Sequence, residues 1–100
     1  MQKQLISNNS NKNNALFVSS LQNAELAINA LTAQGINIIN VDLCQPGKPS
    51  IYVEYSPALA RTITDKIAAY YAFGNRECGK YKQAQYPLHG CRVVWTEYNH

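Results

Sequence analysis

Two short stretches of alternating apolar and polar residues, with a turn between them, constrain the fold most. In residues 36–44, INIINVDLC, the apolar side chains of Ile39, Val41 and Leu43 alternate with polar ones, and residues 50–55, SIYVEY, repeat the pattern. The segment that joins the two stretches contains two prolines and a glycine. Alternation of this kind is typical of strands with one buried face, and such a turn favours close pairing. We therefore predict an antiparallel hairpin here.

A helix is predicted on each side of this hairpin. The first is expected to start at a serine N-cap at Ser19, with Gln22 three residues later as in a capping box, and to end at Gly35. The second is expected to run from the cap at Ser56 to Gly74, with Pro57 in its first turn. Each has a single apolar stripe, and the stripes consist of Leu21, Ala24, Ile28 and Leu31, and of Leu59, Ala60, Ile63, Ile67 and Tyr70. Both helices should therefore cover one face of a sheet.

Strands are also predicted near both ends of the chain. Residues 15–19 form a short apolar run. Near the C-terminus, a strand is predicted with Cys91, Val93 and Trp95 on one face and Arg92, Val94 and Thr96 on the other. Residues 80–86 alternate weakly, and residues 86–90 resemble a turn that starts the last strand. The resulting order, βαββαβ with a possible extra C-terminal hairpin strand, predicts an α+β, ferredoxin-like fold with an antiparallel sheet and two helices on one face. Residues 15–100 form this single domain, and the asparagine-rich residues 1–14 are expected to be a flexible arm.

The net charge of +3 is concentrated in one segment. Residues 76–92 contain four basic residues and one acid, whereas the five basic and five acidic residues elsewhere balance. A local excess of positive charge attracts acidic protein surfaces or phosphates, and interleaved tyrosines are frequent interface anchors. The predicted partner-binding residues are Arg76, Lys80, Tyr81, Lys82, Tyr86 and Arg92.

No arrangement of residues indicates catalysis, a metal or a cofactor. Cys78, His89 and Cys91 lack the paired spacing of zinc ligands, and Cys91 is expected to face the core. The two histidines, in a turn and at the C-terminus, do not lie near a likely pocket. We therefore predict that the protein is not an enzyme. An odd number of cysteines, with no signal-like segment and no long apolar run, predicts a cytoplasmic protein with free thiols and no membrane span.

The segments GCRVVWTE and ALTAQGINI together resemble the short proteins carried by phages, prophages and plasmids. Several such proteins with ferredoxin-like folds are anti-CRISPRs. The resemblance implies a non-catalytic inhibitor that binds a bacterial protein complex, such as a CRISPR–Cas effector, in the host cell cytoplasm. It assigns no role to any individual residue.

Two functions follow as hypotheses. The first is a protein-binding module that uses the basic segment, with a homodimer possible through a sheet edge or through the alanines at positions 68, 69 and 72. The alternative is a domain that binds single-stranded nucleic acid on an open sheet face through aromatic side chains. Against the alternative, the stretch IYVEY lacks the glycine of the RNA-recognition signature and contains Glu54.

Overall fold

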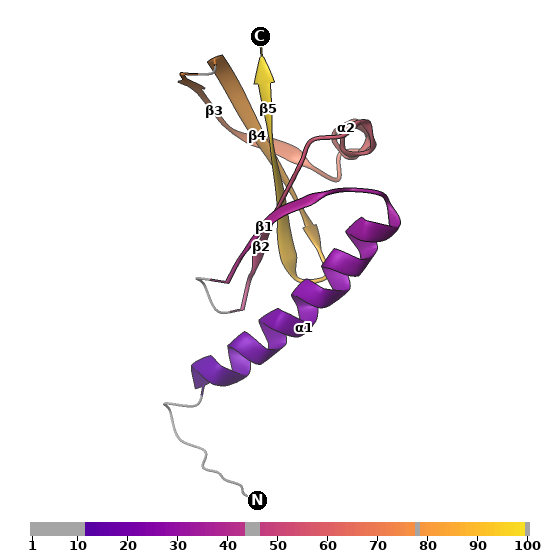
Figure 1. Cartoon of the computed structure of the whole chain (residues 1–100), viewed down its shortest axis with the longest axis vertical. Helices are drawn as coiled ribbons and strands as arrows, with labels where there is room; N and C mark the ends of the chain where they lie inside the picture. The colour runs from indigo at the N-terminus through magenta and orange to yellow at the C-terminus, as the bar shows by residue number, and fades with distance from the viewer. Residues whose placement is uncertain (1–11, 44–46, 78, 100) are drawn as a thin grey trace, which may run out of the picture.

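The computed structural model describes residues 12–43, 47–77 and 79–99 and shows a five-stranded sheet with two helices (Figure 1). In chain order, the elements are α1 (Lys12–Ala33), β1 (Ile38–Asp42), β2 (Ser50–Val53), α2 (Pro57–Thr64), β3 (Ala69–Arg76), β4 (Gly79–Leu88) and β5 (Cys91–Asn99). Helix α1 lies at one end of the molecule, and the β3–β4 hairpin and the end of β5 extend toward the other.

The sheet is mixed, with the strand order β1-β2-β5-β4-β3. Strands β2 and β5 pair in parallel, with Ser50 opposite Arg92 and Tyr52 opposite Val94, and all other neighbours are antiparallel. The predicted ferredoxin-like arrangement with an antiparallel sheet is therefore wrong. The long connection from β2 through α2, β3 and β4 returns the chain beside β2 in the parallel direction.

Both hairpins predicted from alternation are present. Strands β1 and β2 pair as expected, and β4, the possible extra strand, pairs with β5 along its whole length. The turn is narrower than predicted, since residues 86–88 belong to β4. Only His89 and Gly90 form the turn, with positive φ angles of 50° and 76°. Two successive left-handed residues are what a tight two-residue hairpin requires.

The first predicted strand, residues 15–19, is part of α1 instead. The helix begins at Lys12, so its first residues also include the end of the predicted arm, while residues 1–11 lie outside the described part of the chain. The buried stripe is Ser20, Ala24, Ala27 and Leu31, and the predicted stripe member Leu21 is exposed. The predicted cap at Ser19 is wrong, because Ser19 and Ser20 lie inside α1, where Ser20 Oγ accepts a hydrogen bond of 2.9 Å from the Gly47 N–H. The short apolar run therefore extends the helix, since no breaking residue separates it from this stripe.

The second predicted helix is two elements. Helix α2 ends at Thr64, Lys66 takes a left-handed φ of 62°, and the chain continues as β3 rather than reaching Gly74 in a helix. Aromatic residues in this segment favour a strand, and pairing with β4 outweighs the helical preference of its alanines. The predicted alanine-lined helix surface therefore does not exist.

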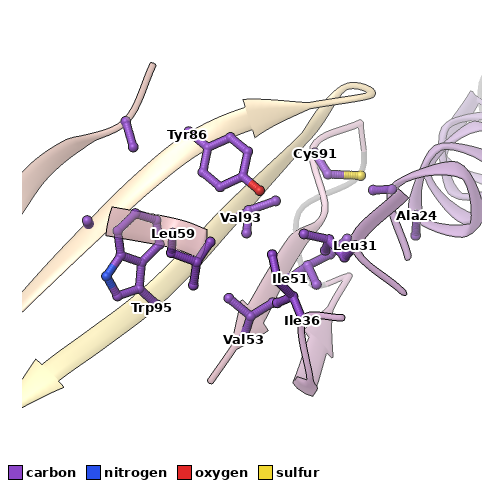
Figure 2. Close-up of a cluster of buried hydrophobic side chains, with 13 residues drawn as sticks. Ala24, Leu31, Ile36, Ile51, Val53, Leu59, Tyr86, Cys91, Val93 and Trp95 are labelled. Atoms are coloured by element: carbon purple, nitrogen blue, oxygen red, sulfur yellow. The ribbon is translucent and has the colours of Figure 1, made fainter. Parts of the chain in front are cut away.

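The hydrophobic core lies between the two helices and one face of the sheet. Figure 2 shows its labelled members, which include Leu31 from α1, Leu59 from α2 and Val93 and Trp95 from β5. The expectation that Cys91, Val93 and Trp95 face the core is confirmed, because each is at most 1% exposed. Tyr86 packs edge-on against Trp95, with ring centroids 6.2 Å apart. One face of the sheet is thus covered by the core, which leaves the other face as a candidate binding surface.

Leu59 is the fully buried residue through which α2 packs on the sheet. Leu59→Ala should lower the free energy of unfolding by about 2–5 kcal/mol because it leaves a cavity beside Trp95. Leu26→Ala is the matched control: it removes the same atoms from an α1 side chain that is 53% exposed, so a change of only about 0.5 kcal/mol is expected. Urea unfolding followed by tryptophan fluorescence measures both, and equal losses would contradict this packing.

Candidate functional site: the open sheet face

We call the sheet surface opposite the helices the open face. Its residues are identified by strand register, because side chains alternate between the two faces. On β5, the open-face residues are those that alternate with the core residues, beginning with Arg92. The residues paired with them on β2 and β4 lie on the same face. On the four strands from β2 to β3 the main members are Ser50, Tyr52, Gly74, Arg76, Tyr81, Gln83, Gln85, Arg92, Val94, Thr96 and Tyr98, with Tyr71 at the bulge of β3.

An arginine and two tyrosines form one cluster on this face, near the far end of β5. The Arg76 guanidinium carbon lies 4.1 Å from the centroid of the Tyr81 ring, and Arg76 Nη1 donates a hydrogen bond of 3.2 Å to the Tyr98 hydroxyl. The Tyr81 and Tyr98 rings are 6.4 Å apart. A Cβ atom at Gly74 would come within 2.6 Å of the Tyr81 ring. A glycine at this position therefore allows the ring to lie across β3 and beneath the arginine.

The second cluster surrounds Arg92. Its Nε donates to Ser50 Oγ and its Nη1 donates to Gln85 Oε1, both at 3.2 Å. The guanidinium carbon lies 5.9 Å from the centroid of the Tyr71 ring. Burial raises the pKa of Tyr71, Arg92 lowers it by a smaller amount, and Tyr52 adds to the rise. The Tyr71 ring therefore stays neutral at physiological pH beside an arginine held in one orientation.

The charged residues that these four strands contribute to the open face are both positive. Arg76 and Arg92 are its charged residues on β2, β3, β4 and β5, and the described strand residues on this face include no carboxylate there. Asp42 belongs to β1, at the edge of the sheet. Between the two arginine clusters lie neutral polar groups, with Gln83 Nε2 donating to Thr96 Oγ1 at 3.1 Å.

The predicted binding residues are divided between the two faces. Arg76, Tyr81 and Arg92 lie on the open face. Lys80 and Lys82 are on the helix side of β4, where the Lys82 ammonium lies 4.5 Å from the centroid of the Tyr70 ring. Tyr86 is buried in the core and 6% exposed. A basic segment in sequence is therefore not one surface, because the strand directs alternate residues to opposite faces.

Sequence reasoning missed three tyrosines of the open face. Tyr52 and Tyr98 alternate with core residues of predicted strands, so the pattern already placed them opposite the core. Tyr71 was concealed by the predicted helix, and its exposure of 42% follows from the strand that replaces it. The signal available was therefore the alternation itself rather than the local charge.

The helix side of the sheet ends in a separate polar network. Glu97 Oε2 accepts hydrogen bonds from Trp95 Nε1 at 2.9 Å and from the Tyr70 hydroxyl at 2.8 Å. Burial, followed by the hydrogen bond and charge of Glu97, raises the pKa of Tyr70 to about 12. These contacts tie β3 to β5 across β4. They provide structural support and place no acid or base next to a nucleophile.

The described residues contain no group of three histidine, cysteine or acidic side chains that could hold a metal ion. Cys91 is buried, and burial raises the pKa of its thiol, which disfavours the reactive thiolate. His89 occupies the β4–β5 turn. Cys44, Cys78 and His100 lie outside the described residues. Neither α1 nor α2, the helices within the described ranges, is long and apolar enough to cross a membrane.

The raised pKa of Tyr70 predicts a specific dependence of stability on pH. Because the folded state holds this proton more tightly, the contribution is complete below about pH 10 and is lost as the pH rises toward 12. Tyr70→Phe should therefore lose stability less steeply than the wild type over that interval. Denaturant unfolding at several pH values measures the slopes. The two curves should run parallel between about pH 7 and 9, and equal slopes at higher pH would contradict the assignment.

Comparison with known proteins gives one match. No curated protein and no solved structure matches the chain. A family model described as "Uncharacterised protein" matches residues 2–98. That match spans the α1 helix, the sheet up to residue 98 of β5, and both arginine clusters of the open face. The chain therefore belongs to this family of uncharacterised proteins.

Proposed function

We propose that the protein binds single-stranded nucleic acid on the open face without catalysing a reaction. The observation that supports this most is the composition of that face: four tyrosines and two arginines on strands that contribute no described carboxylate to it. Nucleic-acid bases stack on aromatic rings whatever their sequence, and a cationic surface follows the phosphates. The cytoplasmic location predicted from the sequence is part of this proposal.

The tyrosines have the properties that stacking requires. Tyr71 and Tyr98 are about two-fifths exposed, at 42% and 41%, so each presents a ring surface while remaining anchored to the sheet. Each ring also contacts an arginine, through a cation–π approach at Tyr71 and a hydrogen bond at Tyr98. A ring held in place loses little conformational entropy when a base stacks on it.

The arginines lie where phosphates can be met. Beside Arg92 is a depression of about 310 Å³ whose lining residues include Lys48 and Gln85 but no carboxylate. Two cations that line one depression suit the oxygens of a phosphate, because charge-assisted hydrogen bonds from arginine to phosphate are strong. Arg76 provides a third cation at the opposite end of the face, beside Tyr81. The spacing of the two clusters along the sheet favours an extended strand over a compact anion.

Binding of an acidic protein surface is the competing function. Tyrosine and arginine are also the commonest anchors of protein interfaces, so the same clusters support the protein-binding role predicted from the sequence. Inhibition of a CRISPR–Cas complex stays a prediction of the resemblance. A nucleic-acid assay separates the two functions, because a surface suited only to protein does not bind bases by stacking.

The direct test is fluorescence anisotropy with a labelled single-stranded oligonucleotide of about 12 nucleotides, within the usual site size of such folds. Tyr71→Ala and Tyr98→Ala should each weaken binding by about 5- to 150-fold, because each removes a stacking platform. Phe73→Ala is the matched control, since this ring is 71% exposed but lies on the helix side of the sheet. Equal effects of all three variants, or no binding by the wild type at low salt, would contradict the proposal.

The salt dependence tests the phosphate contacts separately. If Arg76 meets a phosphate, Arg76→Gln should reduce the slope of log affinity against log salt by about 0.7. Lys80→Gln removes the same charge from the neighbouring strand but on the helix side, so its slope should match that of the wild type. A wild-type affinity that does not change with salt would favour the protein-binding alternative.

A further inference from the structure

Strand β5 has nine residues, and only three of them are paired on both edges. Its pairing with β4 continues to Asn99, opposite Lys80. On the other edge, its parallel pairing with β2 stops at Val94, opposite Tyr52, because β2 ends at Val53. Within the described ranges, no other strand pairs with this edge beyond Val94.

The backbone groups on the open part of the edge belong to Thr96 and Tyr98. The Arg92 N–H donates to the Pro49 carbonyl at 2.9 Å, so Arg92 directs its backbone groups away from β4. In an antiparallel pair the direction alternates from residue to residue, and the β4–β5 register has no shift. Thr96 and Tyr98 therefore point their N–H and C=O groups to the same side as Arg92, where β2 is no longer present.

The two outer edges of the sheet differ from this one. Strand β1 has a register shift between Ile38 and Asn40, and β3 has one between Tyr70 and Ala72. Bulges of this kind are a common way in which proteins prevent an edge from pairing with another chain. The exposed part of β5 has no such irregularity, so it keeps the geometry that a further strand needs.

A groove of about 720 Å³ runs along this edge of β5. Its charged lining residues are Glu54 and Glu97, and its lining includes no lysine, arginine or histidine. Exposed apolar surface is present as well, from Ile39, Tyr55 and Tyr98. The groove is thus acidic and partly apolar, in contrast to the basic open face beside it.

We propose that an extended, basic segment of a partner protein adds to the sheet at the open edge of β5. Its backbone would bond to Thr96 and Tyr98, a lysine or arginine side chain would meet the exposed Glu54, and apolar side chains would contact Ile39 and Tyr55. A second copy of this chain fits less well, because pairing of two β5 edges would bring four carboxylates together. This binding site goes beyond the proposed function and does not depend on it.

The test uses a fluorescent hexapeptide of alternating lysine and valine, with a glutamate–valine peptide of the same length as its counterpart. The full-length protein should bind the basic peptide and not the acidic one. Glu54→Lys should weaken binding of the basic peptide about five- to tenfold, since it replaces attraction with repulsion at an exposed site. Glu77→Lys is the matched control, because it makes the same charge change at an exposed residue outside the groove. Equal weakening by both variants would overturn the proposal.

Hydrogen exchange identifies the mode of binding. Addition of a strand should slow exchange of the Thr96 and Tyr98 amides when the basic peptide is present, while the Glu97 amide, which faces β4, stays as protected as before. Binding without slowed exchange at Thr96 and Tyr98 would overturn strand addition even if the affinity depended on Glu54. Protection of these amides that rises with protein concentration and needs no peptide would show a second copy as the occupant and would also overturn it.

Discussion

The parallel pairing of β2 with β5 is the contact on which the architecture depends. It joins two units that local sequence can build, the β1–β2 hairpin and the β3–β4–β5 meander, into one sheet. It covers only three residue pairs, from Ser50–Arg92 to Tyr52–Val94. The same three pairs place Ile51 beside Val93 in the core, and they place Ser50 beside Arg92, where the hydroxyl accepts the Arg92 hydrogen bond. Core packing and the second arginine cluster therefore both depend on this pairing.

Strand β5 distributes the chemistry of the molecule between two faces. Cys91, Val93 and Trp95 enter the core, and Glu97 continues on that side to bond Trp95 and Tyr70. Arg92 and Tyr98 alternate with these residues along β5 and therefore lie on the open face. The two charged residues of β5 are thereby directed to opposite faces, although Arg92 and Glu97 are only five residues apart. A strand is the element that can do this, because its side chains change face at every residue.

The parts of the fold that could be predicted from sequence are those specified by local pattern. Alternation was sufficient for the β1–β2 hairpin and for the core face of β5. It was not sufficient for residues 69–76, where alanines favour a helix and tyrosines and phenylalanine favour a strand, so that the partner strand β4 decides. Parallel pairing of β2 with β5 joins segments about 40 residues apart, and no local pattern encodes it. Only part of the candidate site could be predicted, for the same reason. Its arginines are evident as basic residues in the sequence, but which residues share one face of the sheet follows only from the strand register.

The open face and the β5 groove are adjacent, and two side chains belong to both. Tyr52 and Tyr98 lie on the open face by register and also line the acidic groove. A ring that stacks against a base on one side cannot at the same time move to accommodate a strand on the other. The groove carries Glu54 and Glu97, which repel phosphate, so a nucleic acid that follows the arginines is confined to the open face. The boundary between the two surfaces is therefore set by β5 itself, where β2 ends and the carboxylates begin.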